Sequence, residues 1–120
     1  MWIEGSVSIG QDDLVLTMSG MAPGQFGFFW MGDGASEVAL YNGYLCVSAG
    51  SIGIFRWSVS IAGSDGVLRT GPGLVAASQG LPGALLAGSS WSFQGIYRDP
   101  GGACGTGINL SDAIWVTWKP

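Results

Sequence analysis

The sequence contains no histidine, and only 10% of its 120 residues are charged. The absence of histidine removes the commonest general base, the usual catalytic triads and most transition-metal sites. The formal net charge is −4, and the only cationic side chains are Arg56, Arg69, Arg98 and Lys119. Four scattered cations cannot neutralise a run of phosphates. The composition therefore argues against nucleic-acid binding and against an anionic membrane surface as partners.

A membrane-spanning segment is not predicted either. Residues 70–97 carry no charge, but Pro72, Pro82 and many glycines interrupt them. The chain is instead rich in glycine, with 22 residues, and 48% of it is hydrophobic. This composition predicts many tight turns and one core in a single domain, residues 1–120. A mean hydropathy of +0.40 fits either an apolar surface that meets a partner or a closed small sandwich, and both remain open.

Strand-like segments separated by turn signals run along the whole chain. The two clearest are residues 91–98 and 109–118, which alternate with period two and predict a C-terminal hairpin. Residues 26–31 are apolar on both faces, which predicts a central strand, and Asn42-Gly43 predicts a two-residue hairpin turn. Further strands are expected at 13–18, 37–41, 44–47, 52–57 and on both sides of 64–66. Residues 70–88 are expected to form a long connection with at most one helical turn, at 81–87.

These segments predict an all-β fold, a single antiparallel β-sandwich of about eight short strands, jelly-roll-like or immunoglobulin-like. No segment of helical length shows a period of 3.6 residues, and no repeat of 20–50 residues is present. The sequence thus predicts an architecture more clearly than an activity.

The order of the motifs resembles a C-terminal β-domain of large secreted or surface proteins from planctomycetes, myxobacteria and similar bacteria. The motifs are DDLVLT at 12–17, GMAPGQFG at 20–27, YLCV at 44–47, IGIFR at 52–56, WSFQGIYRDP at 91–100 and NLSDAIWVTW at 109–118. The resemblance implies an extracellular or cell-surface location behind larger repeat or enzyme domains, and it implies no activity. The chain departs from the pattern at Gly95-Ile96, where an aromatic pair is common, and in its apolar stretch between Arg69 and Gly88.

Cys46 and Cys104 are the only cysteines. With the extracytoplasmic location implied by the resemblance, we expect them to form a disulfide; the alternative is two buried free thiols. Asp99, Asn109 and Asp112 flank one loop and are candidate calcium ligands, although such residues more often cap turns through bonds to the backbone. Arg98 is expected to clamp loop carbonyls or a carboxylate at the sheet edge.

The six tryptophans are many for this length. Most are expected in the core, but Trp57 and Trp115 are candidate platforms for stacking on sugar rings. No paired carboxylate spacing is present, and serine has no histidine to activate it, so we expect no enzyme and no cofactor. The predicted function is a non-catalytic accessory module of a bacterial extracellular or surface protein, mediating attachment, sorting or self-association. A carbohydrate-binding module is the alternative, and a calcium-stabilised adhesive domain is a third possibility.

The predicted partner is a neighbouring domain or a second copy, which would meet an apolar patch. Two segments are candidates for that patch: the first strand, Leu14–Met18, and the apolar connection Leu81–Leu86.

Overall fold

The computed structural model describes residues 1–120 and has an all-β, sandwich-like fold with antiparallel sheets and one short helix. There are ten strands, where about eight were expected; the difference includes the three-residue β1, which is too short to show a period. The elements in chain order are β1 Trp2–Glu4, β2 Val15–Met18, β3 Phe26–Gly32, β4 Gly34–Leu40, β5 Gly43–Ser48, β6 Ile54–Arg56, β7 Ser60–Ile61, β8 Leu68–Thr70, α1 Leu74–Ser78, β9 Ser90–Arg98 and β10 Ile108–Thr117.

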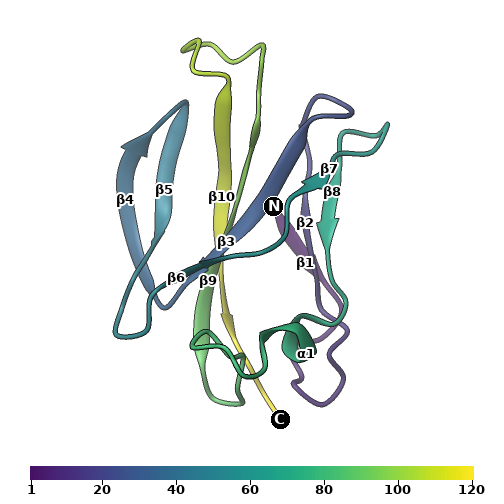
Figure 1. The fold of residues 1–120 in the computed structure, drawn as a ribbon, viewed down its shortest axis with the longest axis vertical. Coiled ribbons are helices and arrows are strands. Elements are labelled where there is room, and N and C mark those ends of the chain that lie inside the picture. The colour runs from purple at the N-terminus through teal and green to yellow at the C-terminus, as the bar shows by residue number, and fades with distance from the viewer.

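Three groups of strands make up the fold. A three-stranded sheet has the order β1-β2-β8, and a five-stranded sheet has the order β10-β9-β3-β6, with β7 also paired to β3. The strands β4 and β5 form a separate hairpin. In Figure 1 this hairpin lies on one side of β10 and β9, and the three-stranded sheet lies on the other. The predicted central position of residues 26–31 is confirmed, because β3 pairs with β9 on one edge and with β6 and β7 on the other.

The core lies between the two larger sheets. Alternate residues of β3 and β9 supply its large side chains, among them Phe29, Trp91 and Phe93, which are fully buried. They pack with Leu16 and Met18 of β2 in one cluster of fifteen buried residues. The face of the five-stranded sheet that carries Phe29 and Trp91 is called the inner face here, and the opposite face is called the outer face.

The C-terminal hairpin alternates as predicted. On β10, Val116 is buried in the core, whereas Trp115 is half exposed on the outer face. A β-bulge between Leu110 and Ala113 interrupts the pairing of β10 with β9. The bulge places Ser111 beside β9, where its hydroxyl accepts a hydrogen bond of 2.9 Å from the Gly95 amide.

The turn of the β4–β5 hairpin is shifted by one residue from the prediction. The two turn residues are Tyr41 and Asn42, and Gly43 already pairs with Leu40. Tyr41 takes the left-handed conformation, with a φ of 52°. Gly43 serves close packing instead, since a Cβ there would lie 3.2 Å from the Asn109 side chain.

The single helix is also displaced from the prediction of residues 81–87. It spans Leu74–Ser78, and its first amides, those of Val75 and Ala76, donate to the carboxylate of Asp12 at 2.7 and 3.0 Å. The capping group thus comes from a distant part of the chain, which a local pattern cannot reveal. This helix of five residues is too short to cross a lipid bilayer, and the fold contains no longer one.

Candidate functional site

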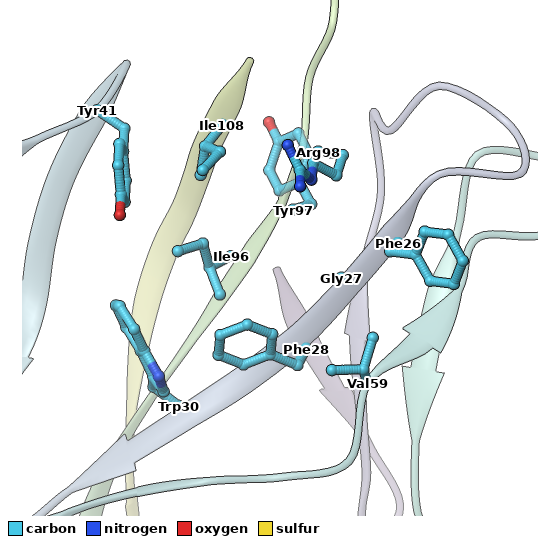
Figure 2. Close-up of a pocket in the computed structure, with 10 residues that line it drawn as sticks. All are labelled: Phe26, Gly27, Phe28, Trp30, Tyr41, Val59, Ile96, Tyr97, Arg98 and Ile108. Carbon is cyan, nitrogen blue, oxygen red and sulfur yellow. The ribbon is translucent and has the colours of Figure 1, made fainter. Parts of the chain in front are cut away.

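A groove lined by aromatic side chains opens on the outer face of the five-stranded sheet (Figure 2). Its floor comes from β3, because Phe26, Phe28 and Trp30 alternate with the core residues and therefore point outward. Ile96 of β9 lies directly opposite Phe28 in the register and extends the same apolar surface.

The groove has walls because other elements rise on each side of β3. Tyr41, at the turn of the β4–β5 hairpin, stands near Ile108 on one side, and Val59 stands near Phe26 on the other (Figure 2). The space within the open groove is about 340 Å³, within the range of roughly 300–1,000 Å³ for small-molecule sites. The ten lining residues are Phe26, Gly27, Phe28, Trp30, Tyr41, Val59, Ile96, Tyr97, Arg98 and Ile108.

Gln94 holds the hairpin wall in place. Its side chain is fully buried on the outer face of β9. The Oε1 atom accepts a hydrogen bond from the Cys46 amide at 2.9 Å, and Nε2 donates to the Tyr44 and Ser111 carbonyls, each at 2.7 Å. One amide group therefore joins β9, the hairpin and the bulge of β10.

The hairpin turn has a second attachment. The Asn42 amide donates to the Ile108 carbonyl at 3.2 Å, and the Thr106 hydroxyl donates to Asn42 Oδ1 at 2.7 Å. These bonds fix the turn beside the start of β10. They therefore also fix the adjacent Tyr41, which forms the wall of the groove.

Two arginines flank the groove without an acidic partner. The Arg56 guanidinium lies 5.5 Å from the centre of the Phe28 ring, and that ring meets Trp30 edge-to-face at 5.6 Å. Arg98 is exposed at one end of the groove and makes no side-chain hydrogen bond or ion pair, so the clamp expected of it is not formed. Of the other two cations, Arg69 pairs with Asp65 at 3.8 Å.

The carboxylates do not line the groove, and nearly all of them bond to other parts of the protein. Seven of the eight accept a hydrogen bond or form an ion pair, and only Glu37 has no such partner. Asp33 shows the pattern most clearly, because it accepts amide hydrogen bonds from Gly50, Ile52 and Gly53 at 2.7–3.0 Å. The bond from Gly53 contributes most to lowering its pKa to about 2. These carboxylates hold loops together.

The predicted disulfide is not formed, and both cysteines carry free thiols. Cys46 is half-buried on β5, and Cys104 is exposed in the loop between β9 and β10. That loop meets the hairpin at Asn42, through Thr106. Asn42 is four residues from Cys46, about 13 Å along a strand that rises ~3.3 Å per residue. The contact between the loop and the hairpin thus lies at the turn, and Cys46 is not part of it.

The calcium candidates are not brought into one cluster. Asn109 Nδ2 donates to Asp99 Oδ2 at 3.1 Å, and Asn109 Oδ1 accepts from the amide of Leu110 at 2.8 Å. Asp112 lies in the bulge and forms an ion pair with the N-terminal ammonium group. These bonds agree with turn stabilisation, and no group of three or more acidic or cysteine side chains converges anywhere in the structure.

The two tryptophans suggested for sugar stacking are far apart on the sheet. Trp115 is half exposed on β10, one edge of the five-stranded sheet. Trp57 follows β6, the opposite edge, and packs against the core. The pair therefore does not form a common platform.

The two segments suggested for self-association also differ. Leu14, Leu16 and Met18 are fully buried, and β2 is the middle strand of its sheet, so the first candidate is wrong. Leu81 and Leu86 are more than half exposed, as the second candidate requires.

The groove itself was not predicted from the sequence. Its signal in the sequence was the apolar character of both faces of residues 26–31, of which the structure covers the inner face completely and the outer face only in part.

No protein-family model, curated protein or solved structure matches the chain. The fold and the groove thus define a small all-β, sandwich-like domain with one aromatic groove on the outer face of its larger sheet.

Proposed function

We propose that this domain is a non-catalytic binding module that attaches a bacterial extracellular or surface protein to its partner through the aromatic groove. The observation that carries the proposal is the groove itself, which leaves Phe26 and Tyr41 half exposed on either side of a partly covered apolar floor. Exposed apolar surface of this kind costs solubility, and its concave shape is typical of ligand sites.

The hydrogen bonds and ion pairs of the carboxylates support a non-catalytic role. A carboxyl group that acts as a general acid or base must be free to exchange protons with a substrate near neutral pH. Here seven of the eight carboxylates bond to the protein itself, and the Asp33 pKa is lowered to about 2. Glu37, the remaining one, lies exposed on β4 and does not line the groove.

The extracellular location rests on the motifs of the sequence, which resemble domains at the C-termini of large secreted and surface proteins. A small module with few charges is compatible with such a position. Attachment, sorting or self-association would then be the contribution of this domain.

Two matched double variants test the role of the groove. Phe26→Ser with Tyr41→Ser removes groove side chains that are 54% and 50% exposed, and Leu81→Ser with Leu86→Ser removes leucines that are 58% and 55% exposed outside it. The labelled domain is incubated with cell envelopes from planctomycetes and myxobacteria, and bound fluorescence is measured against concentration.

We expect saturable binding that the groove variant loses and the leucine variant keeps. Full binding by the groove variant, or no binding by the unaltered domain, would overturn the proposal. Loss only in the leucine variant would move the attachment surface to the connection between α1 and β9. Sedimentation of the same three proteins separates attachment to envelopes from self-association.

A carbohydrate-binding module is the second candidate, and the exposed face of Trp115 favours it. Sugars stack on such rings. A glycan array probed with the domain and with Trp115→Ser tests this candidate: binding that requires Trp115 would support it, whereas no binding of the unaltered domain to any glycan would refute it.

A further inference from the structure

We propose that the groove binds a small aryl carboxylate, with the aromatic ring against the floor of the groove and the carboxylate on the guanidinium of Arg98. The inference rests on the proposed function, because it names the chemical group that the groove holds when the module attaches.

The side chains that line the groove favour a flat, apolar ligand. Phe28 and Trp30 form the floor, and Tyr41 stands across from Phe26 (Figure 2). Aromatic pairs prefer offset-stacked or edge-to-face contacts. Phe28 and Trp30 meet edge-to-face and are each only half-buried, so a third ring can contact them. A space of about 340 Å³ lies within the range of small-molecule sites and suits one small ligand.

The charge of the groove selects an anion. Arg98 is the only charged residue among the ten that line it, and it lacks an acidic partner. Arg56 adds a second positive charge next to the floor, above Phe28. The nearest acidic neighbour of Arg98 in the chain is Asp99, whose Oδ2 already accepts from Asn109. Burial and the negative charge of Asp99 together raise the pKa of Tyr97, so this carboxylate acts on the groove as well. The two guanidinium groups outnumber it, and the groove is therefore a local positive site in a chain of net charge −4.

A guanidinium matches a carboxylate particularly well. It presents parallel N–H donors that can bind both carboxylate oxygens at once. An exposed Arg98 side chain can adopt this geometry without breaking an existing bond, because it has none.

The same lining disfavours sugars and peptide termini. A sugar ring would bring several hydroxyl groups, and a peptide would bring amide groups, into a groove whose lining is mostly hydrophobic. Polar groups that lose water without gaining a hydrogen bond weaken binding. An aryl carboxylate has a single polar group, and Arg98 satisfies it.

The experiment titrates the ¹⁵N-labelled domain with cinnamate and with cinnamamide, which has the same ring and chain but no charge, and follows the amide chemical shifts. Arg98→Gln is the test variant. Arg69→Gln is the matched control, because Arg69 is also exposed and lies outside the groove. N-acetylphenylalanine and glucuronate are titrated in parallel as mimics of a peptide C-terminus and an acidic sugar.

We expect cinnamate to shift the amides of β3 and of the hairpin turn and to bind about tenfold more tightly than cinnamamide, which corresponds to ~1.4 kcal/mol. Arg98→Gln is expected to abolish this preference, and Arg69→Gln is expected to keep it. Equal affinities of cinnamate and cinnamamide in the unaltered domain, or no shifts at the groove, would overturn the inference.

Tighter binding of N-acetylphenylalanine or glucuronate than of cinnamate would also overturn it, in favour of a peptide terminus or an acidic glycan. None of these results decides the proposed function. Binding to envelopes that depends on Phe26 and Tyr41 would stand even if the ligand is not an aryl carboxylate. Conversely, cinnamate binding without envelope binding would leave the ligand class intact and refute the attachment role.

Discussion

Replacing Gln94 by methionine should detach the β4–β5 hairpin from the rest of the fold. Methionine has a similar length and volume, so the substitution removes hydrogen bonds and leaves little cavity. Three bonds disappear: those to the amide of Cys46 and to the carbonyls of Tyr44 and Ser111. All three backbone groups then lack their side-chain partner beside a fully buried residue.

The expected loss of stability is about 3 kcal/mol, because a net contribution of ~1 kcal/mol per hydrogen bond applies to three bonds. Total stabilities of domains are ~5–15 kcal/mol, so this is a large fraction. With a urea m-value of roughly 2 kcal/mol/M, the unfolding midpoint should fall by about 1.5 M. The m-value itself should not change.

Urea unfolding followed by tryptophan fluorescence measures the shift, and amide hydrogen exchange locates it. Gln25→Met is the matched control, since Gln25 is half-buried and its side chain makes no hydrogen bond. We expect the Cys46 amide to exchange faster in the Gln94 variant only. A midpoint shift equal to that of the control, with unchanged exchange at Cys46, would refute the assigned role of Gln94.

Three further outcomes are expected. Because the pKa of Asp33 is lowered to about 2, its stabilising effect is complete above pH ~4 and is lost as the pH falls through 2; acid unfolding of Asp33→Asn should lack this component, and an unchanged acid profile would contradict it. Gly32→Ala should cost about 1–3 kcal/mol, because its Cβ would overlap the backbone of β5, whereas thermal melts should show no loss for Gly101→Ala, which has open space. Native mass spectrometry after brief alkylation should show two reactive thiols, with exposed Cys104 labelled before half-buried Cys46; a species that resists labelling until it is reduced would contradict the free thiols.

The strands that the sequence predicted well are those with a long alternating pattern. Residues 91–98 and 109–118 have eight or more positions each, so burial on one face imposes a clear period of two. β1 has only three residues, and α1 has five. Neither is long enough to carry a period, and both depend on distant partners: β1 on β2, and α1 on the carboxylate of Asp12.

The hairpin turn shows a different limit of prediction from the sequence. Asn-Gly is the usual sequence of a two-residue turn, and it led to the expectation of a turn at Asn42-Gly43. In the structure, the glycine follows the turn, at a position where a Cβ would lie only 3.2 Å from the Asn109 side chain. A glycine can thus serve packing as well as conformation, and only the tertiary structure distinguishes the two uses.

The groove could be predicted only in part for the same reason. Alternation separates Phe26, Phe28 and Trp30 from the core residues of β3, but it does not say which element covers them. That depends on the hairpin, which Gln94 binds from a strand some fifty positions further along the chain. The candidate sites chosen from the sequence alone, the cysteines and the oxygen-rich loop, were instead local in the chain or defined by residue type.

The attachment of the hairpin links the stability of the domain to the proposed binding. Tyr41 forms a wall of the groove, and the hairpin that carries it is held by Gln94 and by Asn42. A ligand that contacts Tyr41 and the floor together binds only the docked hairpin, so it stabilises docking by RT ln(1 + [L]/Kd). Weakening the Gln94 bonds therefore lowers the apparent affinity, because only the molecules with a docked hairpin keep Tyr41 in the groove and bind the ligand. Arg98 lies on β9 outside the hairpin, and its loss should reduce affinity without changing docking. The two residues thus separate formation of the groove from recognition of its ligand.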